Sequence, residues 1–227
     1  MTIQLGVCLA SQITDVDYAV LAEELGFDDL WFADSQMIWS DVYAVMALAA
    51  ARTSRIRIGT GVAVAGTRSV AVTAAAHATI SAIAPGRVFC GIGTGNTAMR
   101  VMGHRPMPIA EFESYIESLL PLLGGRETTV TWRGRTAAVR HLMPEHGFVN
   151  FADRIPLYIS GFGPLGFTTP TSNGGRPDRP TRRVGSASGM STSPCLPTST
   201  RRGSTSACTR DTTVGSFRKR NASSQRN

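Results

Sequence analysis

Residues 87–96 read Arg-Val-Phe-Cys-Gly-Ile-Gly-Thr-Gly-Asn, and this stretch decides the fold that the first two thirds of the chain predict. The apolar run at 88–92 is typical of a strand buried on both faces. The glycines that follow allow a sharp turn or a close approach to a flat ligand, and a helical pattern begins at Thr97. A strand, a small-residue turn and a helix together aim backbone N–H groups at an anion or a ring carbonyl. The spacing is not G-x-G-x-x-G, so the stretch alone also fits an ordinary glycine turn.

The same strand, turn and helix design recurs along the chain. Apolar periodicity and turn residues predict alternating strands and helices, with Gly26 and Pro85-Gly86 closing two of the helices and Ser40 or Asp41 capping another. A turn at 11–15 is expected to supply the cap of the first helix. The segments at 129–132 and 136–139 predict a surface hairpin. The expected strands are 3–9, 29–33, 56–61, 87–92 and 156–160, and the expected helices are 17–25, 42–52, 69–84 and 111–123.

Strands that alternate with helices at this spacing predict an α/β fold with a parallel sheet. Five strand–helix steps favour a partial (β/α)8 TIM barrel, in which five of eight strands are legible; an open doubly wound sheet is the runner-up. A full barrel needs about 250 residues. The pattern fails after residue 164, where the fifth outer helix is expected. We therefore divide the chain into 1–164, the N-terminal part of a barrel, and 165–227, a tail.

The tail differs from the rest of the chain in composition. Residues 1–164 carry 12 Arg, no Lys and 14 acidic residues, whereas residues 165–227 carry 10 Arg, one Lys and two Asp. The formal net charge of +7 therefore comes from the tail. With 22 Ser and Thr among its 63 residues and little aliphatic periodicity, the tail is predicted to be disordered. An Arg-rich arm for nucleic acid is one alternative, although interleaved aromatic residues are missing. We favour out-of-frame translation of a GC-rich gene, because Arg outnumbers Lys 22 to 1.

The sequence shows no targeting, membrane-spanning or metal-binding motif, and the expected location and partners are inferred from this. No signal peptide is visible at Met1, and no apolar run reaches membrane-spanning length. Cys8 and Cys90 lie within apolar strands and are expected to be small core residues. Cys195 and Cys208 complete a set without metal or redox spacing. We expect a cytoplasmic protein with a small-molecule substrate, no nucleic-acid or membrane partner, and a parent that forms homo-oligomers.

Four strand ends are rich in small or acidic residues. In barrels the active site lies at the C-terminal ends of the strands, and small residues at adjacent ends suit a planar ring with a phosphate tail. A metal site is not expected, since the four histidines share no ligand spacing; each is expected to be structural or solvated. The strand-end residues are Asp34; Thr60 and Gly61; Gly93, Thr94, Gly95 and Asn96; and Ser160, Gly161, Phe162 and Gly163.

Three stretches resemble one known family in sequence and in order. They are GFDDLWFADSQMIWSDVYAVMALAAARTSRIRIGTGV, APGRVFCGIGTGNTAMRVMG and IPLYISGFGP, all within residues 3–164. They resemble the bacterial luciferase-like oxidoreductases, and among these the deazaflavin-dependent branch typified by methylenetetrahydromethanopterin reductase. The resemblance implies a (β/α)8 barrel that binds FMN or coenzyme F-420 in its mouth. It ends at Leu165, which agrees with a frameshift near that codon.

The resemblance also implies roles for individual residues. Asp34 matches an acidic residue near the ring, and we take it as catalytic; Trp39 matches an aromatic residue beside the substrate, with ordinary packing as the alternative. Thr60, Gly61 and Val62 match a third-strand bulge that supports the ring, where the Gly61–Val62 bond is expected to be cis. The remaining cofactor contacts are expected from the fourth and fifth strand ends, Gly93, Thr94, Gly95, Asn96, Ser160, Gly161, Phe162 and Gly163.

Departures from the family pattern argue against a sugar-phosphate dehydrogenase. Sugar-phosphate dehydrogenases of the family have a histidine where this chain has Ser35 and a glutamate where it has Asn96. Neither replacement is a proton shuttle at neutral pH. The Thr67-Arg68 pair matches the family, but Ser69-Val70 replaces the usual His-Pro. The resemblance therefore implies hydride transfer or oxygen activation on a small organic substrate.

Three further expectations concern behaviour. Asp34 is expected to face the barrel mouth rather than to pair with a helix-face arginine. A Gly95→Val change is expected to abolish cofactor retention while leaving the fold intact. The 227 residues alone are expected to be an inactive fragment that aggregates, since strands six to eight are not legible in the sequence.

Overall fold

The computed structural model describes residues 3–161. Within this range six strands form one sheet in the order β1-β2-β3-β5-β4, with β8 also paired to β5. These strands are β1 (Gly6–Leu9), β2 (Asp29–Phe32), β3 (Arg57–Thr60), β4 (Ala63–Val64), β5 (Val88–Gly93) and β8 (Leu157–Ile159). The helices are α1 (Asp17–Glu24), α2 (Val42–Arg52), α3 (Val70–Ile83), α4 (Asn96–Val101) and α5 (Ile109–Leu123), with 3-10 turns η1 (Ala65–Thr67) and η2 (Pro144–His146).

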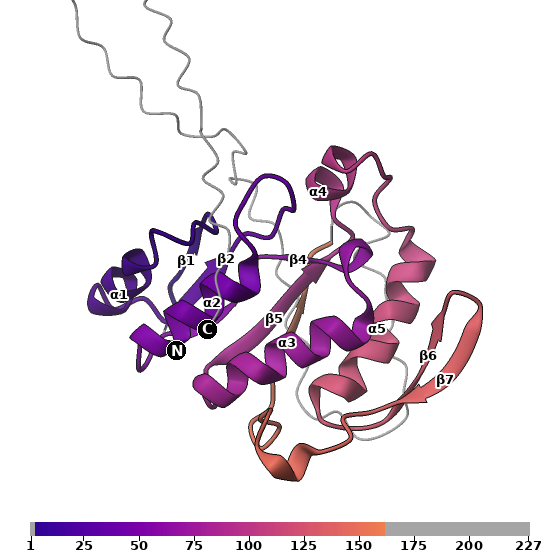
Figure 1. The fold of residues 1–227 in the computed structure, drawn as a ribbon. Coiled ribbons are helices and arrows are strands. Elements are labelled where there is room, and N and C mark those ends of the chain that lie inside the picture. Colours follow the sequence, from indigo (N-terminus) through magenta and orange to yellow (C-terminus); the bar gives the residue numbers. More distant parts are fainter. Residues whose placement is uncertain (1–2, 162–227) are drawn as a thin grey trace, which may run out of the picture. The chain divides into compact units, whose positions relative to one another are not determined.

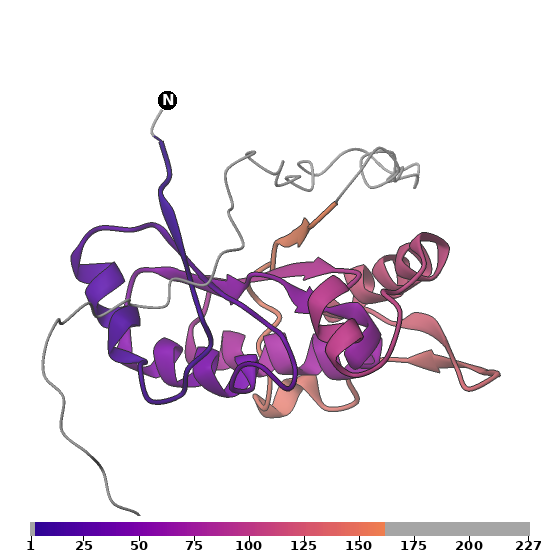
Figure 2. The same ribbon diagram turned by 90° about the horizontal axis from the view of Figure 1, so that it is seen from above.

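Every pairing in this sheet is parallel. Leu30 of β2 lies opposite Ile58 of β3, and Ile58 lies opposite Val88 of β5. Helices α1, α2, α3 and α5 lie on one side of the sheet (Figures 1 and 2). A doubly wound sheet has helices on both faces, so this one-sided layer has the arrangement of a barrel segment. The partial barrel predicted from the sequence is confirmed, and the described strands do not close into a ring.

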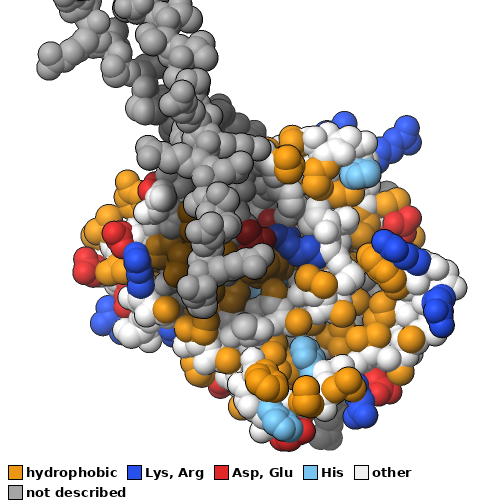
Figure 3. All heavy atoms as spheres, in the orientation of Figure 1, with side chains coloured by type: hydrophobic (Ala, Val, Ile, Leu, Met, Phe, Trp, Pro, Cys, Tyr) orange, Lys and Arg blue, Asp and Glu red, His pale blue; other side chains and the backbone are white. Residues whose placement is uncertain are grey.

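The hydrophobic core lies between the sheet and its helices. Strand side chains alternate in direction, and the set that faces the helices is apolar: Leu30 and Phe32 of β2 and Ile58 of β3 are at most 2% exposed. The Ala-rich character of α2 and α3 lets these helices pack closely, with Ala49 and Ala74 fully buried. Around α3, on the face drawn in Figure 3, hydrophobic atoms are mixed with uncharged polar and backbone atoms, and charged side chains lie mostly toward the margin.

Local signals explain where the helices begin and end. Asp41 caps α2 by accepting hydrogen bonds from the backbone N–H groups of Tyr43 and Ala44, as predicted. Ser69 caps α3 through the N–H of Val72. The predicted side-chain cap of α1 is wrong: Val16 occupies that position and offers no side-chain acceptor.

The antiparallel hairpin of β6 (Thr128–Trp132) and β7 (Arg135–Val139) is confirmed and stands apart from the main sheet, beside α5 (Figure 1). The sequence did not predict β4. This two-residue strand pairs with Ile92 and Gly93 of β5. Because it follows β3 without a helix, strand–helix alternation gives no signal for it.

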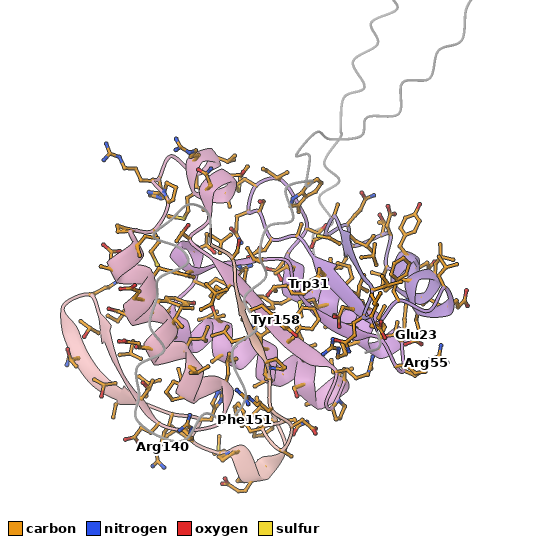
Figure 4. The ribbon with its side chains drawn as sticks, turned by 180° about the vertical axis from the view of Figure 1, so that it is seen from behind. Glu23, Trp31, Arg55, Arg140, Phe151 and Tyr158 are labelled. Carbon is orange, nitrogen blue, oxygen red and sulfur yellow. The ribbon has the colours of Figure 1, made fainter. Side chains whose placement is uncertain are left out.

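The second face of the sheet carries three aromatic side chains. Trp31 of β2, Phe89 of β5 and Tyr158 of β8 contact one another with ring centroids 4.4 to 5.4 Å apart. Seen from behind, Trp31 and Tyr158 lie near each other over the strands (Figure 4). Cys90 faces the helices and is buried, as predicted. Cys8 is exposed, so its assignment to the core is wrong: it lies on this second face beside Trp31, its register partner.

No described helix is both long and apolar enough to cross a membrane. Within residues 3–161 no three His, Cys, Asp or Glu side chains gather at metal-binding distance.

Candidate functional site

The parallel register brings the predicted strand ends to one edge of the sheet. β2, β3, β5 and β8 are successive neighbours, so their C-terminal ends lie side by side. The Ser160 N–H donates to Ile92 O at 2.9 Å, which extends the pairing of β5 and β8 to this edge. Phe162 and Gly163, which were also predicted to contact the cofactor, lie outside the described residues.

Backbone becomes accessible where these strands end. Residues 58–60 and 88–93 are buried, whereas Gly61, Val62, Thr94, Gly95, Ser160 and Gly161 are half-buried and Asn96 is exposed. At Gly61, Gly95 and Gly161 no side chain stands between the backbone and a ligand, although the Gly61 N–H already donates to Phe32 O. The edge is therefore suited to hydrogen bonds with a polar ring system.

The third strand ends in the expected bulge. The peptide bond between Gly61 and Val62 is cis, as predicted. The Gly61 N–H donates to Phe32 O at 2.7 Å, which keeps the bulge against β2. The Thr60 side chain points into the protein, where its hydroxyl donates to Gly91 O at 2.6 Å. Any contact of Thr60 with a cofactor would therefore come from its backbone.

Several glycines near this edge make room for neighbouring protein atoms. A Cβ at Gly59 would overlap the Phe89 ring, and one at Gly61 would come within 2.8 Å of the Trp31 Cβ. Gly59, which was not among the predicted site residues, accommodates aromatic packing on the second face of the sheet. Gly61, Gly95 and Gly161 stay half-buried, whereas Gly93 at the end of β5 is buried, which does not favour its predicted contact with a cofactor.

Gly95 has a structural role as well. Its φ is +78°, a conformation that side chains rarely adopt, and it forms the N-terminal cap of α4. A Cβ there would overlap Val64 Cγ1 and lie 3.1 Å from Met99 Cγ. The expectation that Gly95→Val leaves the fold intact is wrong, since the added methyl groups would meet Val64. Asn96 beside it accepts a 2.7 Å hydrogen bond from Arg100 Nε.

Asp34 follows β2 and is buried in a polar network. Arg68 Nη1 donates to Asp34 Oδ2 at 2.6 Å, and the Asp34 side chain is 3% exposed. Gln36 Nε2 donates to Oδ1 at 2.7 Å, and the Val64 N–H donates to Oδ2 at 3.2 Å. Asp34 was expected not to pair with a helix-face arginine, and its partner Arg68 does lie in the loop before α3 rather than on a helix face; the carboxylate is nevertheless paired with an arginine, which the sequence did not predict. The catalytic role of Asp34 stays a prediction that these contacts do not favour.

The segment between β2 and α2 carries the predicted Trp39. Its side chain is 43% exposed, and the neighbouring Met37 and Ile38 are 80% and 45% exposed. The Trp39 N–H donates to Ser35 O at 3.0 Å, so the backbone of this segment is folded on itself. The exposure of Trp39 does not fit ordinary core packing and leaves its ring available to a ligand.

From the sequence, Arg68 had no expected role in the site beyond its match to a family Thr-Arg pair, and His77 had none. Arg68 also pairs with Asp41 at 3.1 Å and lies 4.8 Å from the centre of the Tyr43 ring. His77 is fully buried on α3, where burial lowers its pKa to about 4 against the opposing hydrogen bond to Thr73 O. The structural role expected for His77 is confirmed. The Thr67-Arg68 family pair was the one available signal for Arg68.

One polar atom near Asp34 has no partner. Gln36 Oε1 is buried and accepts no hydrogen bond within the described residues. A buried acceptor without a donor is costly, and a ring N–H of a flavin or deazaflavin would supply one. This residue and the accessible backbone of the strand ends fit such a cofactor chemically.

Comparison with known proteins gives a consistent family. The family model described as luciferase-like monooxygenase matches residues 14–168. The chain is 30% identical over 154 residues to 5,10-methylenetetrahydromethanopterin reductase of Methanolobus tindarius, covering 65% of this chain and 44% of that protein. It is 34% identical over 168 residues to the F-420-dependent glucose-6-phosphate dehydrogenase of Intrasporangium calvum, covering 66% and 48%. The chain thus spans about half the length of these relatives.

Solved structures show the same fold. The coenzyme F-420 dependent tetrahydromethanopterin reductase from Methanopyrus kandleri superposes with a TM-score of 0.58 at 23% identity, over 73% of this chain and 52% of that one. The oxygenating constituent of 3,6-diketocamphane monooxygenase from Pseudomonas putida, solved with FMN, gives a TM-score of 0.57 at 18% identity, over 72% and 52%. These similarities show that the described sheet and helices have the fold of about half of such a protein.

Proposed function

The chain belongs to the luciferase-like monooxygenase family, and we propose that it carries the cofactor-binding edge of an oxidoreductase that uses coenzyme F-420 or FMN. The observation that supports this most is the gathering of the matching strand ends of β2, β3, β5 and β8 at one edge of one sheet. Relatives named as F-420-dependent and a neighbour solved with FMN add to it.

The residues at the strand ends and Trp39 would have different roles. The backbone of Gly61, Val62, Thr94 and Gly95 would hydrogen-bond and support the ring, and Ser160 and Gly161 would complete the edge. Trp39 would lie beside the substrate and against the cofactor ring. When bound, the cofactor would supply hydride transfer or oxygen activation. The protein's own contribution would be to bind, to orient and to exclude water from a small organic substrate.

Cofactor titration of the full chain tests this proposal. Purified protein is titrated separately with F-420 and with FMN while absorbance and fluorescence are followed, and we expect saturation by one of them at one equivalent. Trp39→Ala should weaken binding at least tenfold. Trp132→Ala is the matched control, because Trp132 is 55% exposed on the distant hairpin strand β6. Equal affinities of the two variants would exclude Trp39 from the site.

The second candidate is that these 227 residues are an inactive fragment, without the activity of an enzyme whose barrel is closed. Within residues 3–161, β1 and β8 each pair with a single strand of the sheet, and open edges favour association. We propose that residues 165–227 are out of frame, which the coding DNA would decide. The family match ends at residue 168. A continuing strand and helix pattern in another reading frame supports this candidate, and its absence contradicts it.

A further inference from the structure

Arg68 joins three elements of the described structure through one guanidinium group. Its Nη1 donates to Asp34, which follows β2, and its Nη2 donates at 3.1 Å to Asp41, which caps α2. Tyr43 of α2 lies against the guanidinium, 4.8 Å from ring centre to Cζ. The Arg68 side chain is 13% exposed, so these charges interact largely away from water.

The Asp34 carboxylate is fully engaged by this arrangement. Its Oδ1 accepts from Gln36 Nε2 and, at 3.5 Å, from Arg68 Nη2, and its Oδ2 accepts from Arg68 Nη1 and from the Val64 N–H. With the side chain 3% exposed, neither oxygen is free to receive a proton from a substrate or to bind a ring N–H. What the carboxylate does instead is to hold the Val64 N–H at 3.2 Å.

Val64 lies in the segment that follows the third strand. Residues 61–68 leave β3, pair with β5 through Ala63 and Val64, and turn through η1 into α3. The Thr67 hydroxyl donates to Val64 O at 2.9 Å, and the Tyr115 hydroxyl donates to Arg68 O at 3.2 Å. The segment is thus held at Val64 by Asp34 and at Arg68 by Tyr115 of α5.

From these contacts we propose that Arg68 is a positioning residue: it fixes the Asp34 carboxylate against the Val64 N–H and thereby orders residues 61–68, one wall of the cofactor site. The cofactor-related part of this inference rests on the proposed function; the ordering of the segment does not. Asp34 acts with Arg68 in this role and does not touch the reacting atoms.

The geometry requires arginine and not merely a positive charge. A guanidinium group presents several N–H donors in a fixed plane and can bind two carboxylates while stacking on an aromatic ring. A lysine ammonium is a point charge on a flexible stem and can approach Asp34 or Asp41, but it cannot reproduce the planar contact with Tyr43. Arg68→Lys should therefore have part of the effect of Arg68→Met.

The test combines hydrogen exchange with cofactor titration on the full chain. We expect amides of residues 61–68 to exchange at least tenfold faster in Arg68→Met and severalfold faster in Arg68→Lys, with amides of β2 unchanged. Cofactor dissociation constants should rise at least tenfold in Arg68→Met. Arg52→Met is the control, because Arg52 and Asp17 form an ion pair of similar length, 2.6 Å, but with side chains 52% and 87% exposed.

Each outcome decides the proposal. Unchanged exchange at 61–68, or an equal rise in every segment, overturns it, because Arg68 would then have no local role or a merely global one. Local loosening with unchanged cofactor affinity also overturns it. Local loosening in a chain that binds neither F-420 nor FMN supports the ordering role while contradicting the proposed function. Should Arg68→Met aggregate, the Arg68→Lys exchange pattern decides.

Discussion

Two carboxylates bind loops at opposite ends of the parallel strands, one through backbone hydrogen bonds and the other through a buried ion pair. Glu23, at the end of α1, accepts hydrogen bonds from the backbone N–H groups of Ser54, Arg55 and Ile56, just before β3. Asp34, beyond the C-terminal end of β2, is buried against Arg68. Glu23 and Arg55 lie at the edge of the sheet, away from Tyr158 (Figure 4).

The difference distinguishes the end of the sheet that serves stability from the end at which we propose the cofactor site. Glu23 fixes a single loop with neutral donors and is partly exposed, so its charge is shared with water. Asp34 is compensated by a full positive charge and links β2, the 61–68 segment and α2 through Arg68. In barrels the N-terminal ends of the strands serve stability and the C-terminal ends serve chemistry. The arrangement with the buried, charge-compensated carboxylate lies at the C-terminal end.

Removing the charge of Asp34 should have the largest effect. Asp34→Asn leaves Arg68 buried with only Asp41 as a counter-ion, and breaking a buried ion pair costs about 3–5 kcal/mol. We expect about 3 kcal/mol, since Arg68 retains some contact with water. Urea unfolding of both proteins at neutral pH measures the difference. If the free energy of unfolding fell by less than about 1 kcal/mol, the Asp34–Arg68 pair would contribute no more than an ordinary surface ion pair.

As the pH falls, His77 should be the first of these groups to lower the unfolding free energy of the protein. Burial lowers its pKa from 6.5 to about 4, so the unfolded chain gains a proton that the folded chain refuses. Stability should therefore be unaffected above pH 6.5 and fall between pH 6.5 and pH 4, by about 2–3 kcal/mol. Unfolding free energies at pH 7.5 and 4.5 measure this. In His77→Gln that slope should largely disappear, and a slope that persists would assign it to other groups.

Gly95 and Gly134 form a matched pair that separates backbone strain from steric overlap. Gly95 has a φ of +78° and Gly134 a φ of +76°, but a Cβ would overlap Val64 at Gly95 and meet nothing within 4 Å at Gly134. Both alanine variants should lose about 1 kcal/mol from the backbone term, and Gly95→Ala should lose about 1–2 kcal/mol more. Thermal unfolding of the two variants compares their stabilities directly. Equal losses of stability would mean that the close approach of Gly95 to Val64 contributes nothing to the effect.

Glu23→Gln should have the smallest effect. Burial disfavours the charged carboxylate, but the hydrogen bonds from Ile56, Arg55 and Ser54 outweigh it and lower the pKa to about 2. This stability is present above pH 4.5 and is lost as the pH falls from 4.5 toward 2. Because Glu23 is partly exposed, we expect only about 1 kcal/mol at pH 7. The wild type should show an acid slope below pH 4.5 that Glu23→Gln lacks, and identical slopes would contradict this.

The sequence predicted the fold well because its signals are local. Alternating strands and helices, the Asp41 cap and the turn at Gly26, whose φ is +83°, each depend on residues a few positions apart. β4 was missed because two residues after a bulge carry no periodicity. The exposure of Cys8 was missed for another reason: an apolar strand pattern does not say which face of a sheet is covered.

The candidate site was predicted less completely than the fold. Strand order brings the ends of β2, β3, β5 and β8 together, so their residues could be named in advance. The pairing of Asp34 with Arg68 joins residues 34 positions apart, and no local pattern reveals it. Likewise, a glycine that accommodates a ligand and one that accommodates Phe89, such as Gly59, look the same in the sequence.

Hydrogen exchange of the full chain with and without cofactor tests the central claim most directly. If the C-terminal ends of the strands form the cofactor site, F-420 or FMN should slow exchange at residues 61–64 and 93–97. Residues 54–56, which Glu23 holds at the opposite end, should keep their exchange rates. Protection confined to residues 54–56, or none anywhere at saturating cofactor, would contradict the account.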